Sequence, residues 1–238
     1  MIWALHGNLG APDDWNTVEE AMSVEEFEKV DLWAKRPGRF SSWAYELNDV
    51  ASALDTKPLV MGYSLGGRLA MHAVTGLDAS WEAAIFVSAH PGLTSEVERR
   101  ERLERDEEWA RMLREGEPRQ FLNAWNAQPV FGGDSASDWQ GLLVDTHREE
   151  LARAFEVWSL GRQEDLRGKL AASGVPQLWV VGARDAKFRA IAEEAVSEIP
   201  MATLCVIPGC GHRVLLQKPT VLAECVADFL SQNPNSKI

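Results

Sequence analysis

The sequence predicts an α/β fold class, in which a mostly parallel sheet carries helices on both faces and is interrupted by a helical insertion. Three observations lead to this prediction. Short apolar runs of strand length alternate with helix-like stretches in both end portions of the chain. Residues 83–88 are apolar almost without interruption, which is typical of a strand covered on both faces. Between residue 94 and about residue 170 the pattern is helical, and we expect no strand there.

The individual elements follow from these patterns. Before the insertion, strands are expected at residues 2–5, 29–34, 59–61 and 83–88. Pro12 begins a helical turn, Ser41 or Ser42 is expected to cap a helix that carries apolar residues as far as Leu54, and a further helix covers residues 68–74. After the insertion, we expect strands at 177–181 and 203–207, and helices near 190–199 and at 219–230.

The insertion divides the chain into two predicted domains. Residues 1–89 and 171–238 form the core, and residues 90–170 form a helical cap, or lid. Ser95 and Glu98 have the spacing of a capping box, and they open a charged helix through Arg114. A second helix runs from Pro118 through Trp125 and is broken by the Gly-Gly-Asp at 132–134, and a third covers residues 149–160. Residues 233–238 are expected to fray.

Composition excludes several classes of function. The 238 residues are 45% hydrophobic, enough for one core with a cap, and the net charge of -12 disfavours nucleic acid or an anionic membrane as a partner. No apolar run approaches a membrane span, and a strand-like run directly after Met1 leaves no signal peptide. The three cysteines are odd in number and lack metal-ligand spacing, so we expect reduced thiols in a cytoplasmic protein. No metal or cofactor motif is present, so none is expected.

The chemistry centres on a Gly-x-Ser-x-Gly pattern at residues 62–66, between a predicted strand and a predicted helix. In that context the pattern is a nucleophile elbow, a tight turn that exposes a serine. Small neighbours are needed because strand and helix pass closely at this turn, and glycine supplies them. The first backbone N–H of the following helix, from Leu65, can then stabilise developing negative charge. The sequence therefore predicts Ser64 as the reactive residue.

A reactive serine needs a base and an acid that orients it. Asp185 follows the strand at 177–181, and His212 lies in a glycine-containing loop after the strand at 203–207, which gives the order serine, acid, histidine. Asn8, in the glycine-containing loop after the first strand, can supply a second backbone donor for an oxyanion, although that loop is also consistent with a simple turn. The histidines that precede Asp185 are alternatives for the base: His6, His72, His90 and His147.

Several blocks of sequence resemble a known family over nearly the whole chain. They are residues 5–10 with 14–15, residues 62–68, the His-Pro-Gly-Leu at 90–93, Trp125 with 128–131, and residues 182–189. Together these blocks resemble the succinyl-hydroxycyclohexadiene-carboxylate (SHCHC) synthases of menaquinone biosynthesis, in the α/β-hydrolase superfamily. The resemblance implies a lyase that eliminates pyruvate from a polycarboxylate cyclohexene intermediate, with the Ser-His-Asp triad as base and no cofactor.

The resemblance also implies substrate-binding residues. Arg68 matches an arginine of the elbow helix, Arg102 a cap arginine and Trp125 a cap tryptophan, and guanidinium groups suit a small-molecule substrate with several carboxylates. Each has an alternative: Arg68 as a surface residue, Arg102 as the helical ion-pair partner of Glu98 or Asp106, and Trp125 as a packing residue.

The chain also departs from the family pattern. Asn126 stands where the resemblance predicts a tyrosine, Asn8 replaces an apolar residue, and a further cap arginine has no counterpart in register, so neither Arg148 nor Arg153 is assigned to it. These differences leave room for a changed substrate. The alternative function is a serine carboxylester or carbon-carbon bond hydrolase acting on a small acidic substrate. A non-catalytic binding protein is disfavoured because all three triad residues are present.

Overall fold

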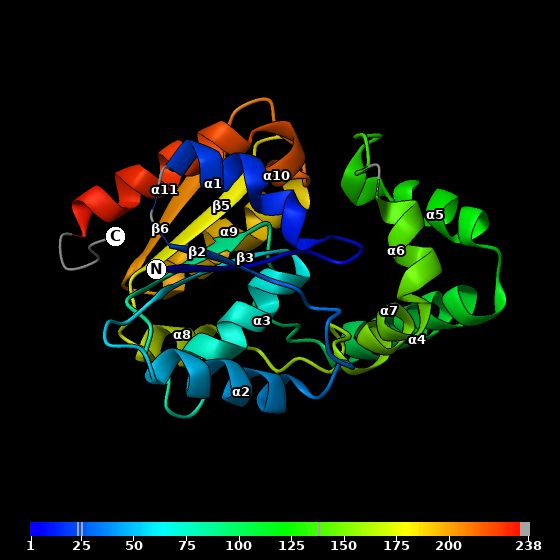
Figure 1. The fold of residues 1–238 in the computed structure, drawn as a ribbon, viewed down its shortest axis with the longest axis horizontal. Coiled ribbons are helices and arrows are strands. Elements are labelled where there is room, and N and C mark those ends of the chain that lie inside the picture. The colour runs from blue at the N-terminus through cyan, green and yellow to red at the C-terminus, as the bar shows by residue number, and fades with distance from the viewer. Residues whose placement is uncertain (23, 25, 138, 234–238) are drawn as a thin grey trace.

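Six parallel strands form the centre of the molecule, in the order β2-β1-β3-β4-β5-β6 (Figure 1). The structure is a computed structural model, and it describes residues 1–22, 24, 26–137 and 139–233. This sheet confirms the predicted α/β class. The strands are β1 (Ile2–Leu5), β2 (Phe27–Val30), β3 (Leu59–Tyr63), β4 (Ala83–Val87), β5 (Gln177–Gly182) and β6 (Ala202–Ile207).

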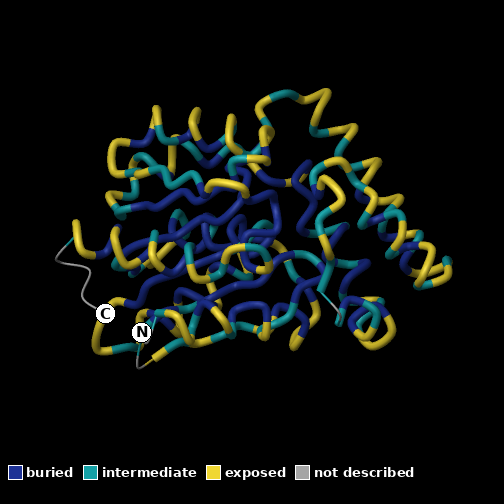
Figure 2. Tube along the Cα trace, turned by 90° about the horizontal axis from the view of Figure 1, so that it is seen from above, coloured by how far each residue is buried: buried dark blue, intermediate teal, exposed yellow. Residues whose placement is uncertain are grey.

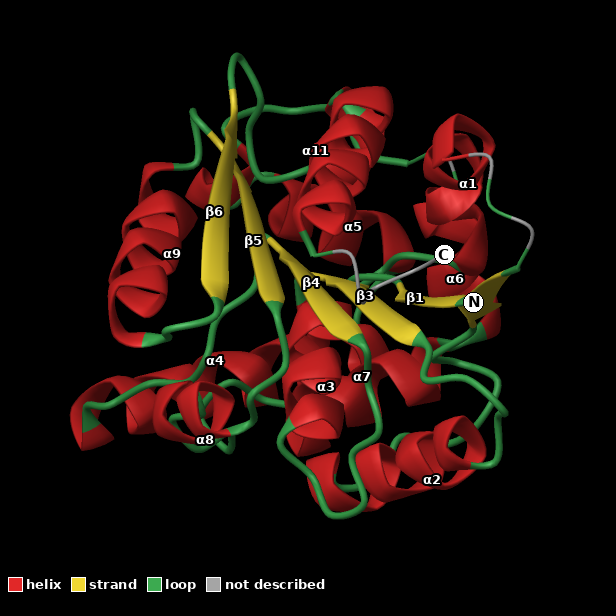
Figure 3. Ribbon diagram, turned by 90° about the vertical axis from the view of Figure 1, so that its left-hand side faces the viewer, coloured by secondary structure: helices red, strands yellow, loops and turns green. Residues whose placement is uncertain are grey.

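Helices cover both faces of the sheet, and the central strands are the most deeply buried part of the chain (Figures 2 and 3). One apolar cluster joins the sheet to α1 (Asn16–Met22), which follows the 3-10 helix η1 (Pro12–Trp15), and to the short α10 (Val214–Gln217) and α11 (Pro219–Gln232). The other apolar cluster joins it to α2 (Phe40–Ser52), α3 (Leu65–Val74), α8 (Arg167–Ala172) and α9 (Ala186–Glu198). In the described part of the chain, no helix is both long and apolar enough to cross a membrane.

The segment between β4 and β5 is helical where the structure describes it, and no strand lies there, as predicted. It holds α4 (Glu96–Glu115), α5 (Pro118–Asn126), the 3-10 helix η2 (Pro129–Phe131), α6 (Gln140–Thr146) and α7 (Arg148–Val157). Ser95 caps α4 by accepting a hydrogen bond from the backbone N–H of Glu98. The helices α4 to α7 lie beside the end of the sheet toward which β1 runs (Figure 1). The sequence did not predict α6, α8 or α10.

Two predictions in the first ninety residues are wrong in detail. The second strand ends at Val30, and Leu32 and Trp33 are buried in a turn instead, where the Trp33 indole donates to the Gly10 carbonyl at 2.8 Å. Their burial therefore comes from a loop, which an apolar run alone does not distinguish from a strand. The helix α2 begins at Phe40, so Ser41 and Ser42 lie inside it and do not cap it.

The prediction of three reduced cysteines is also wrong. Cys205 of β6 and Cys225 of α11 form a disulfide, with Cα atoms 6.6 Å apart, while Cys210 is free and buried. The two half-cystines are separated by 20 residues in the chain and meet because α11 packs against β6. That contact depends on tertiary packing, which cysteine spacing does not reveal. The predicted frayed tail at 233–238 lies outside the described residues except for Asn233.

Candidate active site

The carboxyl ends of the parallel strands bring the predicted site residues together. Asn8 follows β1, Ser64 follows β3, Asp185 follows β5 and His212 follows β6, and all four line one cavity of about 690 Å³. In an open parallel sheet this edge is where ligands bind. Side chains from α4, α5 and η2 line the same cavity.

Backbone geometry places Ser64 at the sheet edge. Its φ of 51° and ψ of -108° lie outside the regions that non-glycine residues favour, and its N–H donates to the Val87 carbonyl at 2.8 Å. A Cβ on Gly66 would lie 2.2 Å from the Leu5 carbonyl oxygen, and one on Gly62 would lie 2.3 Å from the Gly66 carbonyl oxygen. Only glycine therefore fits on either side of the elbow.

The turn also supplies a hydrogen-bond donor. Leu65 is the first residue of α3, so its N–H has no partner inside the helix and lies at the positive end of the helix dipole. Asn8 lines the cavity from the neighbouring loop, and its side-chain oxygen Oδ1 is buried without a hydrogen-bond partner among the described residues. Leu65 and Asn8 both line the cavity, and an oxyanion site formed by their backbone N–H groups stays a prediction.

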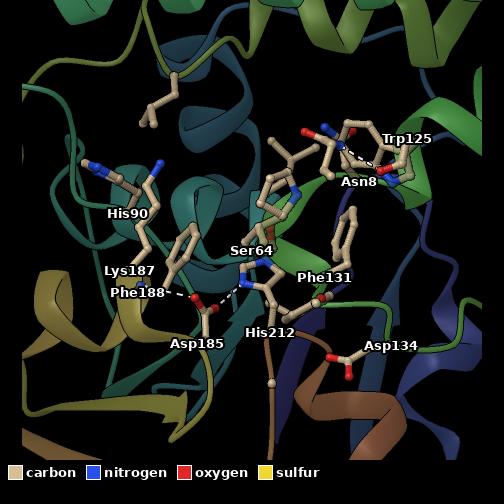
Figure 4. A pocket seen from close by; sticks show the side chains of 18 of the residues that line it. Asn8, Ser64, His90, Trp125, Phe131, Asp134, Asp185, Lys187, Phe188 and His212 are labelled. Atoms are coloured by element: carbon tan, nitrogen blue, oxygen red, sulfur yellow. Dashed lines mark hydrogen bonds and ion pairs between the residues drawn. The ribbon is translucent and has the colours of Figure 1, made fainter.

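His212 is paired with Asp185. The distance from His212 Nδ1 to Asp185 Oδ2 is 2.6 Å, and both side chains are buried. The other carboxylate oxygen, Oδ1, accepts the N–H of Phe188 at 3.3 Å and caps α9, which fixes the carboxylate in place. When Nδ1 carries the hydrogen of this bond, Nε2 is free to accept a proton from Ser64. Figure 4 shows the imidazole between Ser64 and the carboxylate.

The His212 ring is enclosed by three aromatic side chains. Its centroid lies 4.5 Å from that of Phe188, 5.7 Å from that of Tyr63 and 5.9 Å from that of Phe131. Burial raises the pKa of Tyr63, so this phenol is neutral at physiological pH. The aromatic enclosure limits both the rotation of the imidazole and the access of water to it.

The other histidines are placed differently. Of the described histidines, only His90 and His212 line the cavity. His90 Nδ1 accepts the N–H of Gly92 at 3.1 Å, and burial lowers the pKa of His90 to about 3. The ring is therefore neutral, carries its hydrogen on Nε2 and can act as a donor but not as a base at neutral pH. His6 accepts a backbone N–H, His72 stacks on Phe40 and His147 contacts Thr146.

Arg68 lies inside the cavity wall and not on the surface. It is 7% exposed, its Nε donates to Gln163 Oε1 at 2.8 Å, and its Nη2 donates to the Trp158 carbonyl. No carboxylate of the described residues lies within ion-pair distance of it. Burial, and then the charge of Arg102, lower the pKa of Arg68 to about 9, so the group stays cationic at neutral pH. A buried cation without a counter-charge suits an anionic ligand.

Arg102 and Trp125 each make a structural contact and also line the cavity, so their positions are consistent with a structural role and with ligand binding. Arg102 Nε contacts both carboxylate oxygens of Asp106, at 2.8 and 2.9 Å, and both side chains also line the cavity. Trp125 packs against Trp109 and Phe155, with ring centroids 5.4 and 5.3 Å away, and it too lines the cavity. Packing and ligand contact are therefore compatible at these positions.

Cations outnumber carboxylates around the cavity, although the chain carries a net charge of -12. Sequence reasoning missed three of them. Lys187 could have been suspected, because it lies at the start of the helix that follows Asp185 and a strand end. Burial, followed by the charges of Arg102 and Arg105, lowers the pKa of Lys187. The cationic lining residues are Arg68, Arg102, Arg105, Arg184 and Lys187, and the acidic ones are Asp106, Asp134 and Asp185.

The described residues hold no group of three or more His, Cys, Asp or Glu side chains arranged for a metal ion. The cavity itself offers an elbow serine, a paired histidine and several cations.

Comparison with known proteins identifies the family. Residues 4–225 match the model of the alpha/beta hydrolase family. The protein belongs to the alpha/beta hydrolase family. Among its relatives, the 2-succinyl-6-hydroxy-2,4-cyclohexadiene-1-carboxylate synthase of Klebsiella pneumoniae is 31% identical and that of Salmonella agona 32%, each aligned over 95% of this chain and 92% of the relative. These relatives confirm the resemblance that the sequence blocks indicated, and this alpha/beta hydrolase is an enzyme.

The fold of this alpha/beta hydrolase has a similar counterpart among solved structures. The structure of MenH from S. aureus aligns with a TM-score of 0.88 at 22% sequence identity, covering 98% of this chain and 94% of the other. At that identity the similarity shows the fold alone. The alignment spans the inserted helices as well as the sheet.

Proposed function

We propose that this protein is a lyase that eliminates pyruvate from a polycarboxylate cyclohexene intermediate of menaquinone biosynthesis. The observation that carries the proposal is one cavity that combines the elbow serine with the buried cation Arg68, which has no carboxylate partner among the described residues. The relatives at 31% and 32% identity are 2-succinyl-6-hydroxy-2,4-cyclohexadiene-1-carboxylate synthases, and the resemblance of the sequence blocks to that family implies the elimination of pyruvate. We also propose that residues 90–170 act as a cap over the cavity and residues 1–89 and 171–238 as the core.

In the proposed reaction Ser64 acts as a base and forms no covalent intermediate. His212 Nε2 takes the hydroxyl proton of Ser64, and the Ser64 oxygen removes a carbon-bound proton that is acidified by a neighbouring carbonyl. Asp185, 2.6 Å from Nδ1, stabilises the imidazolium that forms. The carbon-oxygen bond to the three-carbon leaving group then breaks, and the imidazolium returns its proton as pyruvate forms. Protons and charges therefore balance within the site.

Negative charge develops on the substrate before the leaving group departs. In the proposed reaction this charge is that of an enolate, and the backbone N–H groups of Leu65 and Asn8 would stabilise it as an oxyanion hole. Arg68 and Arg102 would hold substrate carboxylates, and Trp125 would pack on the ring between them. Arg68 has two donor groups already fixed by protein oxygens, so its orientation is set before the substrate binds.

Incubation of the purified protein with the menaquinone-pathway precursor tests this proposal, with pyruvate followed by a coupled dehydrogenase. Release of pyruvate that depends on Ser64 is the expected result. The matched control is Ser231→Ala, which changes an exposed serine of α11 far from the cavity. If no pyruvate appears above the no-enzyme background, the proposed reaction is wrong.

The strained elbow and the His212–Asp185 pair also suit a serine hydrolase, which is the second candidate function. It would cleave an ester or carbon-carbon bond of a small acidic substrate through an acyl-Ser64 intermediate. Intact-protein mass spectrometry after treatment with an activated short-chain ester or an organophosphate distinguishes the two. A stoichiometric adduct on Ser64 together with ester turnover favours the hydrolase, and pyruvate release without ester turnover favours the lyase.

A further inference from the structure

Arg213 follows His212 directly and reaches from the core into the inserted segment. Its side chain is buried, with 4% of the residue exposed. Nη1 donates to the Asp134 carbonyl at 2.7 Å, and Nη2 donates to Asn126 Oδ1. Asn126 ends α5, and Asp134 lies between η2 and α6. One guanidinium thus bridges two points of the insertion to the residue beside the paired histidine.

The acceptors of this bridge are neutral. Among the described residues no carboxylate lies within ion-pair distance of Arg213, and burial lowers the pKa of Arg213. Burying a charged group costs free energy unless its hydrogen bonds are well formed. A guanidinium fits such a position because its donors lie in a fixed planar array that can bond two acceptors at once.

The amide of Asn126 is oriented for this contact. Its Nδ2 donates to Gln140 Oε1 of α6 at 3.0 Å, which leaves Oδ1 as the acceptor facing Arg213. Asn126 is the position where the resemblance to the SHCHC synthases predicts a tyrosine. The departure from the family pattern therefore coincides with a specific contact made by this chain's own residues.

The same guanidinium covers an aromatic ring of the cavity wall. The carbon Cζ of Arg213 lies 4.0 Å from the centroid of Phe131, and the Phe131 ring contacts that of His212 at 5.9 Å. Trp125, next to Asn126, lines the cavity together with Phe131. Figure 4 shows Trp125 and Phe131 on one side of the cavity, with His90 and Lys187 on the other. Arg213 therefore packs on the Phe131 part of this wall and bonds the residue that follows Trp125.

We propose that Arg213 is a positioning residue, whose bridge to Asn126 and Asp134 holds the wall of Trp125 and Phe131 against His212. Its effect on the reaction rests on the proposed function. Without the bridge, η2 and the end of α5 move away from the core, the His212 ring loses one of its aromatic neighbours, and water reaches the imidazole. In the proposed function, Arg68 and Arg102 hold the substrate carboxylates, and neither bonds Asn126 or Asp134. Loss of the bridge therefore leaves those two binding contacts in place, so the reaction step suffers more than binding does.

Arg213→Met tests the bridge because it keeps an apolar chain over Phe131 and removes every donor. Asn126→Ala removes the side-chain oxygen that accepts from Arg213, and the double variant completes a double-mutant cycle. We expect kcat of pyruvate release to fall about tenfold in each single variant and no further in the double variant, with KM changed less than about twofold. Arg213→Lys, which can still donate to one acceptor, should restore part of kcat. Multiplicative losses in the double variant, or a change confined to KM, would overturn the proposal.

Hydrogen-deuterium exchange reports on the bridge without any substrate. In both single variants we expect amides of residues 127–134 to exchange about tenfold faster, while those of β3 and β5 stay unchanged. Arg111→Met, which removes an exposed arginine paired with Glu108, is the control and should change neither exchange nor kcat. Unchanged exchange at 127–134 in both variants would contradict the bridge. If the wild-type protein releases no pyruvate, the exchange result still tests whether the bridge holds the wall. If Arg213→Met does not fold, exchange in Asn126→Ala provides the same test.

Discussion

The loops at the carboxyl edge of the sheet and the helices of the insertion line one cavity, but different interactions hold them in place. At the sheet edge, backbone contacts set the position of Ser64, as the hydrogen bond to Val87 and the close approach of Gly66 to Leu5 illustrate. In the insertion, α4 buries only Asp106, Ala110 and Leu113 of its 20 residues. Side-chain contacts therefore determine where the insertion lies.

Those side-chain contacts differ in strength. Arg114 of α4 pairs with Glu149 and Glu156 of α7 at the surface, and exposed ion pairs contribute at most about 1 kcal/mol. The aromatic contacts of Trp109 with Phe121 and Phe155 contribute about 0.5–1.5 kcal/mol each beyond the area that they bury. The buried bridge from Arg213 costs more to break than a surface pair, because its loss leaves buried acceptors without their donor. We therefore expect changes at the elbow to act on the chemical step or on folding. Changes at the cavity cations Arg68 and Arg102 should act on substrate binding, and changes at the Arg213 bridge on the position of the wall formed by Trp125 and Phe131.

Among changes at the sheet edge, Ser64→Ala should have the largest effect on the rate of pyruvate release. Loss of the base should reduce kcat of pyruvate release about 10⁴-fold, the upper end of what a general base contributes, while the fold stays intact. Kinetics with the pathway precursor and a thermal melt measure the two quantities. Residual activity within tenfold of the wild type would show that Ser64 is not the base.

Gly66→Ala compares the backbone constraint of the elbow with that of the insertion. A Cβ at Gly66 would lie 2.2 Å from the Leu5 carbonyl, and backbone atoms cannot move aside, so we expect a loss of about 3 kcal/mol in the free energy of unfolding. Gly141→Ala in α6 is the matched control, because nothing lies within 4 Å of its added Cβ. Denaturant unfolding should show a neutral or stabilised control. Equal losses in the two variants would contradict the difference in constraint.

Arg68→Met tests the cation that the core contributes. Charge-assisted hydrogen bonds contribute about 1.5–3 kcal/mol, so kcat/KM should fall roughly a hundredfold, mainly through KM. The double variant Arg102→Met/Asp106→Leu removes the cation and its partner of α4 together, and its expected loss is about tenfold because part of the Arg102 charge is already neutralised. A larger loss in the double variant than in Arg68→Met would reverse the proposed ranking of the two cations.

His72→Phe should have the smallest effect, which is on the free energy of unfolding and depends on pH. Burial, and then the charge of Arg68, lower the pKa of His72 to about 3, and its Nε2 is buried without a partner among the described residues. Below pH 6.5 the His72 imidazole takes up a proton in the unfolded chain but not in the folded chain. The contribution of neutral His72 to the free energy of unfolding is therefore fully present above pH 6.5 and is lost as the pH decreases toward 3. The slope is at most about 1.4 kcal/mol per pH unit for one group. Urea unfolding at pH 7 and pH 5 should show a shallower pH dependence for the variant, and an unchanged dependence would refute this assignment.

Local patterns account for much of the fold and for the residues at the sheet edge. The strand, elbow and helix around Ser64 were predicted because glycine spacing and apolar periodicity are local properties, and Asp185 and His212 were predicted because each directly follows an apolar strand. The structure places all three around one cavity, and their catalytic roles stay predictions. The turn at Leu32 and Trp33 was mistaken for a strand because burial in a loop and burial in a sheet leave the same apolar pattern.

The sequence by itself determined the α/β class, the helical nature of the insertion and the order of Ser64, Asp185 and His212, because these depend on periodicity and on the ends of elements. Only the tertiary structure decided that Cys205 meets Cys225, that Arg68 has no acidic partner among the described residues, and that Arg213 bonds Asn126. These depend on how segments tens of residues apart pack together, and side-chain partners across such distances are set by the relative placement of whole helices and strands.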